Sequence, residues 1–301
     1  MMNHTVDARN EPVVGTPGRA HNHRLAVSLT FDFDADSAWR RDDPGHSPAS
    51  ASRWLYGVFE GMPRILALLD RLDLPATFFV PGATCDCHAD VVKRIVDAGH
   101  EIGHHGYFHE APNRLNPEQE RAVIERGLEA LHRAVGAAPL GYRSPSWELS
   151  NSSLPLLVEY GFAYDASQLA KDRPYRVEID GRPTSLIEVP SAWELCDAAH
   201  FLFAYSPTYL AGMSAPSKVE EIWRGDFDGL YAEAGDACLV LTLHPEIIGR
   251  PHRMQLLERM LRHILEHDDV WFAQMHAIAD DFQRREVARS GLLNKDIVVS
   301  P

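Results

Sequence analysis

Three aspartates alternate near the start of the chain, directly after an apolar run. Asp32, Asp34 and Asp36 follow residues 25–29 in the stretch TFDFDAD. Because successive side chains of a β-strand point to opposite faces, the three carboxylates fall on one side, and at least two of them crowd one spot. Like charges this close raise each other's pKa unless a cation relieves them. The pattern indicates a divalent metal, with one aspartate as ligand and its neighbour hydrogen-bonded nearby. A solvated acidic loop is the alternative, and we favour it for Asp36.

Four histidines lie within ten residues further along, at His100, His104, His105 and His109. A spacing of four lets two imidazoles meet one ion from a turn or a helix, and both His105 with His109 and His100 with His104 have it. The spacing alone leaves the choice of pair open. Two histidines and one carboxylate leave coordination positions for water and substrate, which is typical of a catalytic rather than a closed structural site.

The elements that must position these residues alternate along the chain. Short apolar runs and segments of helical period follow one another roughly seven times with no linker, which predicts a single barrel-like α/β domain. In a β/α barrel, the loops after the strands share the face that carries the active site. The predicted strand ends are Asp32–Asp34, His104–His109, Arg143–Pro145, Tyr164–Asp165 and His244–Glu246. Carboxylates and imidazoles converging on one face favour a metal site.

The same periodicity predicts the element and domain boundaries. Strands are expected at 25–33, 76–80, 101–103, 140–142, 162–165, 186–193, 238–243 and 270–272, and helices at 52–72, 88–98, 116–135, 152–160, 218–233, 254–267 and 277–285. Asn116 suits the N-cap of its helix, Pro117 the first turn and Gly136 the end. We expect a polar tail at 1–23, one domain at 24–286 and a C-terminal tail at 287–301.

An insertion at about 168–217 interrupts this alternation. It contains several prolines and the aromatic residues Trp193, Phe201, Phe203, Tyr205 and Tyr209. Such a segment is expected to form a lid over one end of the barrel. Packing of these aromatics into the barrel or into a subunit interface is the alternative.

Composition limits the class of partner. The chain has 301 residues, 45% of them hydrophobic, and a formal net charge of −14, with no long blocks of Lys or Arg. These features argue against nucleic acid or an anionic membrane surface as the main partner. The first 23 residues lack the apolar core of a signal peptide, and no stretch approaches the ~20 apolar residues of a membrane span. We therefore expect a soluble, cytoplasmic protein.

The cysteines add little to this picture. Cys85, Cys87, Cys196 and Cys238 lack the paired spacing of a zinc knuckle and are too sparse for a disulfide scaffold. We expect reduced thiols. A metal site at Cys85 and Cys87 is the less favoured alternative to an ordinary loop.

Four motifs, in order, resemble a known family. They are similar to the motifs of the polysaccharide deacetylase (NodB-homology, carbohydrate esterase 4) family. The four stretches are Thr30–Asp34 (TFDFD), Gly99–His109 (GHEIGHHGYFH), Tyr142–Pro145 (YRSP) and Leu243–Pro245 (LHP). The resemblance covers about residues 25–285 and implies a distorted (β/α)7 barrel. In the usual family motif the two aspartates are adjacent, whereas here Phe33 separates them. In this respect the motif resembles that of one branch of the family, which contains the Helicobacter-type peptidoglycan deacetylases, the allantoinases and the cyclic imidases.

The resemblance implies a role for each matching position. It makes Asp32 the general base, His244 the general acid and Arg143 the residue that orients Asp32. It settles the histidine register and makes the metal ligands Asp34, His105 and His109. The implied cofactor is a divalent metal, with zinc first and other divalent metals as alternatives. Such an ion would polarise an amide carbonyl and lower the pKa of a bound water.

Other residues near the site are assigned more loosely. We expect substrate contacts from Trp193 in the insertion and from Trp147 and Arg250 at the rim. Asp165 is either a partner of His244 or a strand-end cap, with equal weight. Arg143 has an alternative as an ordinary salt bridge at the barrel rim.

The expected reaction is hydrolysis of a carbon–nitrogen bond other than a peptide bond. The family favours deacetylation of an N-acetyl sugar in a glycan, whereas the lid favours a small cyclic amide or ureide, as in an allantoinase or cyclic imidase. An inactive metal- or carbohydrate-binding protein and a scaffold protein are alternatives of other classes, disfavoured because Asp32 and His244 are both present. The branch also implies a homo-oligomer.

Overall fold

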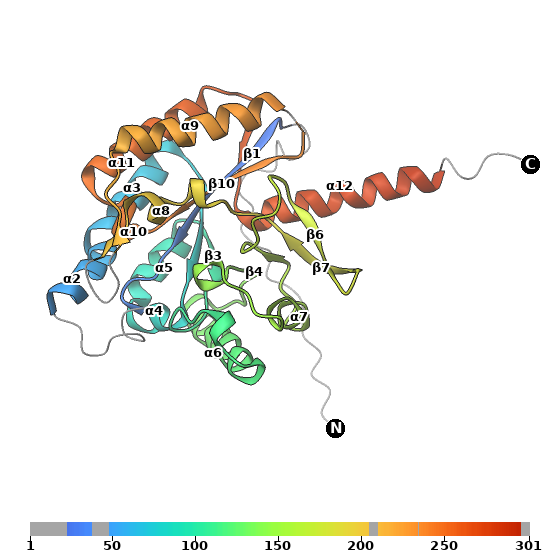
Figure 1. Cartoon of the computed structure of the whole chain (residues 1–301), viewed down its shortest axis with the longest axis horizontal. Coiled ribbons are helices and arrows are strands. Elements are labelled where there is room, and N and C mark those ends of the chain that lie inside the picture. Colours follow the sequence, from blue (N-terminus) through green and yellow to red (C-terminus); the bar gives the residue numbers. More distant parts are fainter. Residues whose placement is uncertain (1–22, 38–47, 205–209, 234, 296–301) are drawn as a thin grey trace, which may run out of the picture.

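The computed structural model describes residues 23–37, 48–204, 210–233 and 235–295 (Figure 1). Its main sheet contains seven parallel strands in the order β10-β1-β2-β3-β4-β5-β7. Their bounds are Leu25–Asp32 (β1), Thr77–Val80 (β2), Glu101–His104 (β3), Gly141–Tyr142 (β4), Tyr164–Asp165 (β5), Arg182–Glu188 (β7) and Cys238–Leu243 (β10). In the described residues, β10 does not pair with the opposite edge, so the sheet curls without closing. The predicted distorted (β/α)7 barrel is confirmed.

Two further strands extend the sheet. β6 (Tyr175–Ile179) forms an antiparallel hairpin with β7, and β11 (Val270–Phe272) pairs with the first residues of β1. A separate two-stranded sheet joins β8 (Phe203–Ala204) to β9 (Leu210–Ala211).

Helices surround the outside of the curled sheet (Figure 1). The α-helices are α2 (Pro48–Tyr56), α3 (Met62–Leu72), α4 (Gly82–Cys87), α5 (Ala89–Asp97), α6 (Pro117–Val135), α7 (Ser153–Glu159), α8 (Asp197–Phe201), α9 (Pro216–Glu233), α10 (Pro245–Ile248), α11 (Pro251–Leu265) and α12 (Met275–Lys295). A π-helix, η1 (Gly57–Gly61), joins α2 to α3, and short 3-10 helices lie at η2 (Pro112–Arg114), η3 (Pro145–Trp147) and η4 (Trp193–Leu195). None of the helices in the described ranges is long and apolar enough to cross a bilayer.

Local signals predicted the ends of helix α6 correctly. Asn116 caps α6 by accepting a hydrogen bond from the Gln119 backbone N–H, and the Gln119 side chain binds the Asn116 backbone in return. Gly136 ends the helix in the left-handed conformation, at φ 80°. This reciprocal capping box satisfies two backbone donors that a helix start otherwise leaves without partners.

Strand β1 shows how the barrel separates two environments. Leu25, Val27, Leu29 and Phe31 belong to the large cluster that packs against the surrounding helices. The alternate residues of β1, which include Thr30 and Asp32, face the barrel interior. All eight residues of β1 are buried. A carboxylate at the end of such a strand is therefore removed from water unless a cavity opens beside it.

The carboxyl ends of the strands lie level with one another. Paired residues run Val80↔His104↔Tyr142↔Asp165↔Glu188 across one side, and Asp32↔Phe79 and Phe31↔Leu243 across the other. The loops that follow these strands therefore open on one face. This register gathers the motif residues, although they are spread over more than two hundred positions.

The structure adds detail to two domain predictions. Helix α12 continues to Lys295 and projects away from the barrel (Figure 1), so residues 287–295 of the expected C-terminal tail are helical. Part of the expected insertion at 168–217 belongs to the barrel itself, because β7 pairs in parallel with β5 as a member of the main sheet. Polar composition after residue 287 and prolines in the insertion are weak signals for irregular structure. Helical propensity in the first segment and pairing with β5 in the second outweigh them. Residues 1–22, 205–209 and 296–301, including Tyr205 and Tyr209, lie outside the described residues.

Helix α10 packs against η1 through glycines that leave no room for a side chain. A Cβ atom at Gly61 would lie 2.1 Å from the carbonyl oxygen of Pro245, and one at Gly249 would lie 2.4 Å from the Cα atom of Gly61. Because α10 directly follows His244, this close contact fixes the position of the loop that carries His244.

We expect Gly61→Ala to lower the free energy of unfolding by about 1–3 kcal/mol, because the new methyl group must push α10 away. Gly225→Ala is the matched control, since a Cβ there meets nothing within 4 Å. In the middle of helix α9, alanine should raise stability by about 0.5–1 kcal/mol. Urea denaturation measures both changes. A Gly61→Ala protein as stable as the wild type would contradict the packing argument.

Candidate active site

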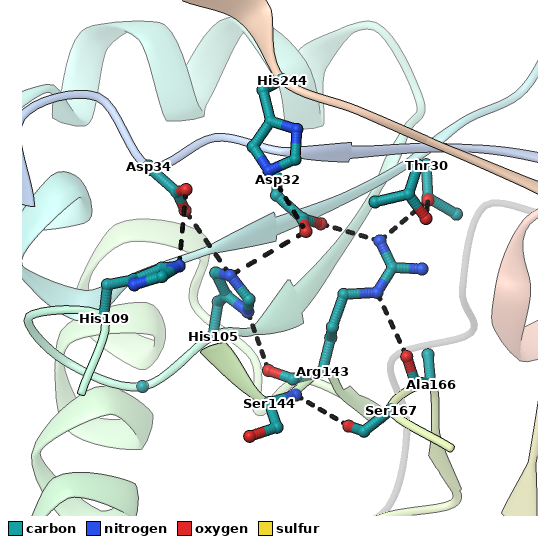
Figure 2. Close-up of polar contacts among 12 residues, drawn as sticks. Thr30, Asp32, Asp34, His105, His109, Arg143, Ser144, Ala166, Ser167 and His244 are labelled. Atoms are coloured by element: carbon teal, nitrogen blue, oxygen red, sulfur yellow. Dashed lines mark hydrogen bonds and ion pairs between the residues drawn. The ribbon is translucent and has the colours of Figure 1, made fainter. Parts of the chain in front are cut away.

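Asp34, His105 and His109 converge at the open end of the barrel (Figure 2). The Nε2 atoms of His105 and His109 each lie 3.5 Å from an oxygen of Asp34. One ligand atom from each residue lies within 4.8 Å of the others, so a single ion fits among them. His105 is 1% exposed, and the other two are only slightly exposed, which leaves the cluster open on the cavity side.

The hydrogen bond behind His105 fixes its tautomer. Its Nδ1 atom lies 2.8 Å from the backbone oxygen of Arg143. A carbonyl only accepts hydrogen bonds, so Nδ1 carries the proton and Nε2 presents a lone pair toward the carboxylate of Asp34. Burial lowers the pKa of His105, although the carboxylates of Asp32 and Asp34 oppose that shift. A neutral imidazole with Nε2 free is the form that binds a metal ion.

The structure also shows why the other histidine pair is not involved. His104 is fully buried, its Nε2–H donates to the carbonyl of Ile124, and its Nδ1 accepts from the backbone N–H of Gly106. Burial lowers the pKa of His104 to about 4, so it stays neutral as a packing residue. His100 lies at the start of β3 against Phe78. The spacing of four therefore brings His105 and His109 to one carboxylate, whereas His104 is held by the backbone around it.

A tight turn brings His109 back to the site. The chain bends at Gly106, and the backbone N–H groups of Gly82 and Ala83 at the start of α4 donate to the carbonyls of Gly106 and Tyr107. His109 itself is left-handed, at φ 60°. The two histidines thus meet from a turn, which was one of the two geometries that their spacing predicted.

Asp32 is paired with a buried arginine inside the barrel. The Nη1 atom of Arg143 donates to Asp32 Oδ1 at 2.7 Å and to Thr30 Oγ1 at 2.8 Å, and its Nε donates to the carbonyl of Ala166 (Figure 2). Burial raises the pKa of Asp32, but Arg143, His105 and His244 outweigh burial and lower it. Asp32 is therefore ionised and held in one orientation. Arg143 is 0% exposed, so the alternative of a salt bridge at the barrel rim is wrong.

His244 faces Asp32 from the other side. Its Nε2 atom lies 3.9 Å from Asp32 Oδ2, and its Nδ1 lies 2.7 Å from Asp197 Oδ1. The Asp197 carboxylate also accepts the backbone N–H of His244. Burial lowers the pKa of His244, but Asp197 and Asp32 outweigh that effect and raise it well above the ordinary value. His244 can therefore carry a proton on the nitrogen that faces the cavity.

Asp197 was missed by sequence reasoning, which offered Asp165 as a partner of His244. Asp165 instead lies at the end of β5, 0% exposed, where it accepts a hydrogen bond from Ser167 and pairs with Glu188 on β7. It does not line the cavity, so its assignments as a partner of His244 and as a substrate contact are wrong. Asp197 lies in the insertion, 47 residues before His244, and no local pattern connects the two.

Cys196, Asp197 and His244 form a second group with ligand atoms within 4.8 Å of one another. Burial raises the pKa of the Cys196 thiol to about 11, so the thiolate that would bind a metal is disfavoured. His244 Nδ1 is already engaged by Asp197. The first group is the better metal site among the described residues.

A cavity of about 250 Å³ lies above the ligand cluster. Asp32, Asp34, His109 and His244 contribute to its lining, while Trp54, Trp147, Trp193, Leu202 and Ile247 make most of the walls. The rings of Trp147 and Trp193 lie 4.4 Å apart, centroid to centroid. Both predicted tryptophans thus lie at the cavity, and Trp54 is an aromatic wall that sequence reasoning missed.

The other predicted rim residues lie elsewhere. Arg250 does not line the cavity, because its guanidinium stacks on the ring of Tyr56, 3.5 Å from the centroid. Phe201 is buried in the main core. Phe201 is thus part of the core, and the substrate contact expected at Arg250 stays a prediction.

Backbone strain concentrates around this cavity. Ala35, His109, Ser146 and Trp147 all line it and all have left-handed backbone conformations, with φ between 48° and 60°. Such conformations are costly for residues other than glycine and gather at functional sites. Four of them around one cavity indicate that its shape is fixed at some cost in stability.

The comparisons agree with this geometry. A sequence model described as polysaccharide deacetylase matches residues 21–164. A peptidoglycan deacetylase of Helicobacter pylori is 34% identical over 284 residues, which cover 87% of this chain and 97% of that protein. The chain belongs to the polysaccharide deacetylase family.

Solved structures show that the similarity covers nearly the whole chain. A protein of Mycobacterium smegmatis, provisionally named a polysaccharide deacetylase, matches with a TM-score of 0.84 and 35% identity, over 93% of this chain and 96% of that one. Puue allantoinase matches with a TM-score of 0.77 and 26% identity, over 93% and 98%. Proteins similar to this chain are thus named for different activities.

The Asp165–Glu188 pair gives a pH prediction. Burial raises the pKa of Asp165 to about 6, and burial together with Asp165 raises the pKa of Glu188 well above its ordinary value. The folded state therefore binds more protons than the unfolded chain, and the stability that the pair contributes is present below about pH 4 and is lost as the pH rises through about 6.

Asp165→Asn should flatten this dependence, because the amide can donate a hydrogen bond to an ionised Glu188. Thermal unfolding between pH 4 and 8 measures the effect, with exposed Asp90→Asn as the control. Parallel curves for the wild type and Asp165→Asn would show that the pair does not share a proton.

Proposed function

We propose that this protein is a metal-dependent hydrolase of a carbon–nitrogen bond other than a peptide bond, and that its substrate is an N-acetyl sugar of a glycan. One observation carries the proposal. Asp32 Oδ2 lies 3.9 Å from His244 Nε2 and 4.0 Å from His105 Nε2, so a proton acceptor, a proton donor and the ligand cluster meet at one end of one cavity. The name of the Helicobacter pylori relative supports the choice of substrate.

Asp34, His105 and His109 would hold the metal. The residues fit a divalent ion, because two neutral nitrogens and a carboxylate converge while Arg143 fixes the His105 tautomer. Zinc is our first choice for this donor set. When bound, such an ion supplies a Lewis acid for the amide carbonyl and lowers the pKa of a water.

The chain's own groups then move the protons. Asp32, kept ionised and oriented by Arg143, accepts the proton of the attacking water. His244, protonated and oriented by Asp197, donates its Nε2 proton to the departing nitrogen. Each group needs the other, because the amine leaves only when it is protonated, and the water attacks well only when it loses its proton.

The small size of the cavity favours a second candidate, a small cyclic amide or ureide. Its volume of about 250 Å³ is below the roughly 300–1,000 Å³ of sites for drug-sized ligands, and tryptophans wall it. The allantoinase neighbour supports this candidate. The cytoplasmic location and the homo-oligomer expected from the sequence stay predictions.

Metal binding tests the ligand assignment. After dialysis against a chelator, the wild type should rebind about one equivalent of zinc. His105→Ala and His109→Ala should each weaken zinc affinity more than roughly 10–100-fold, because that is the loss expected when only a residue that supports a metal ligand is removed. His132→Ala, on the exposed side of α6, should bind as the wild type does. Equal affinity in all three variants, by calorimetry, would refute this ligand set.

Hydrolysis tests the function. The wild type should release acetate from N-acetyl sugars or chitooligosaccharides, or open allantoin or a cyclic imide, and chelation should abolish the activity. Asp32→Asn should lower kcat about 10²–10⁴-fold, as expected for loss of a general base. Asp36→Asn is the matched control, because Asp36 shares the alternation but does not line the cavity. Activity retained in Asp32→Asn would overturn its assignment as the base.

A further inference from the structure

Glu110 is a carboxyl beside the candidate metal site that the proton transfers described above do not use. It directly follows His109 and is half-buried. Its Oε2 atom accepts hydrogen bonds from two consecutive backbone N–H groups, that of Tyr107 at 3.0 Å and that of Phe108 at 2.8 Å. Hydrogen bonds from backbone N–H groups to a carboxylate are among the stronger ones in proteins. The side chain of Glu110 therefore folds back on its own turn and closes it.

The turn that Glu110 closes is the one that carries His109 to the site. Gly106 and His109 are both left-handed, at φ 70° and 60°. Such a conformation is costly for a histidine and persists only where the surrounding structure imposes it. The carboxylate is closely fitted into the bend, because a Cβ atom at Gly106 would lie 3.3 Å from Glu110 Oε2 and 3.2 Å from the Cγ atom of Pro145. The two hydrogen bonds to Glu110 thus span the segment between the left-handed residues and hold a bend that the backbone alone disfavours.

The two histidines of the candidate metal site are held by different parts of the chain. The ring of His105 is fixed from the barrel, where its Nδ1 atom lies 2.8 Å from the carbonyl of Arg143 (Figure 2). His109 lies at the far end of the turn, and its Nε2 atom lies 3.5 Å from an oxygen of Asp34. Glu110 binds the backbone on the side of the turn that leads to His109. It is therefore placed to keep the second imidazole at the right distance from the first and from the carboxylate.

We propose that Glu110 is a positioning residue, which fixes the turn of His109 and thereby raises the affinity of the site for a divalent metal ion. The inference rests on the ligand set of the proposed function and deepens it. In this role Glu110 does not touch the ion, because it acts through the backbone that carries a ligand. A group that is already held in its bound conformation loses less conformational freedom on binding, so the affinity is higher.

Zinc affinity, measured by calorimetry on chelator-treated full-length protein, tests the proposal. Glu110→Ala should weaken zinc affinity at least about 10-fold, as expected for loss of a residue that supports a metal ligand. Glu110→Gln should retain most of the affinity, because its amide oxygen can still accept both backbone N–H groups. Glu118→Ala is the matched control, since Glu118 is exposed in the first turn of α6, and it should bind as the wild type does.

Cobalt substitution gives a second readout that a purely structural role would not change. The visible absorption of bound cobalt reports the arrangement of its ligands. The spectrum should change in Glu110→Ala, because His109 no longer meets the ion in the same geometry, and should stay that of the wild type in Glu110→Gln and Glu118→Ala.

The outcomes separate two failures. Zinc affinity in Glu110→Ala equal to that of the wild type would overturn the positioning role and leave the ligand set standing. Equal losses in Glu110→Ala and Glu110→Gln would also overturn it, because the effect would then come from the missing charge. A wild type that binds no zinc, or that binds it equally well without His105 and His109, would overturn the ligand set and this inference with it. If thermal unfolding shows that Glu110→Ala is not folded, Glu110→Met, which keeps the length of the side chain without an oxygen acceptor, replaces it with the same expected loss.

Discussion

The buried pair of Arg143 and Asp32 is the interaction on which the rest of the site depends. One arginine carries out three tasks, since its side chain holds Asp32, crosses to Thr30 and the carbonyl of Ala166, and its backbone oxygen fixes the tautomer of His105. A charge buried inside a barrel is tolerated only when it is paired and hydrogen-bonded. The strand register that aligns β1 with β4 through β2 and β3 thereby constrains both Asp32, the proposed proton acceptor, and His105, a proposed metal ligand.

Around this pair, the site gathers more negative than positive charge. Asp32, Asp34 and Asp197 lie near one cavity, and Arg143 alone does not balance them. A protonated His244 and a divalent cation would complete the balance, which is the condition that the alternating aspartates implied. This excess of carboxylates is the physical reason for proposing a cation at this position.

Much of the fold followed from the sequence, because its signals are local. The apolar alternation of β1 and the capping box at Asn116 act within a few residues, and the structure confirms both. The two histidines of the candidate metal site also lie close together in sequence. The choice between the two histidine pairs needed tertiary facts, namely the carbonyl of Ile124 that engages His104 and the carbonyl of Arg143 that orients His105.

The failures have the opposite cause. Asp165 ends a strand, as a site residue should, but its side chain hydrogen-bonds Glu188 away from the cavity. Asp197, in contrast, reaches His244 from a segment with no periodic pattern. Ser146 and Trp147 have left-handed conformations, although neither residue type favours them. The surrounding structure imposes these conformations, so the local sequence does not predict them. Contacts made across the sheet, and strain maintained by packing, cannot be predicted from local sequence.

Anomalous diffraction at the zinc edge, on crystals grown with zinc, tests the central claim most directly. The account predicts one strong peak about 2.0–2.2 Å from an oxygen of Asp34 and from the Nε2 atoms of His105 and His109, with His105 Nδ1 still bonded to the Arg143 carbonyl. A peak at Cys196, Asp197 and His244 instead would contradict it. Fully occupied zinc sites elsewhere in the crystal, with no peak at Asp34, His105 and His109, would also contradict it.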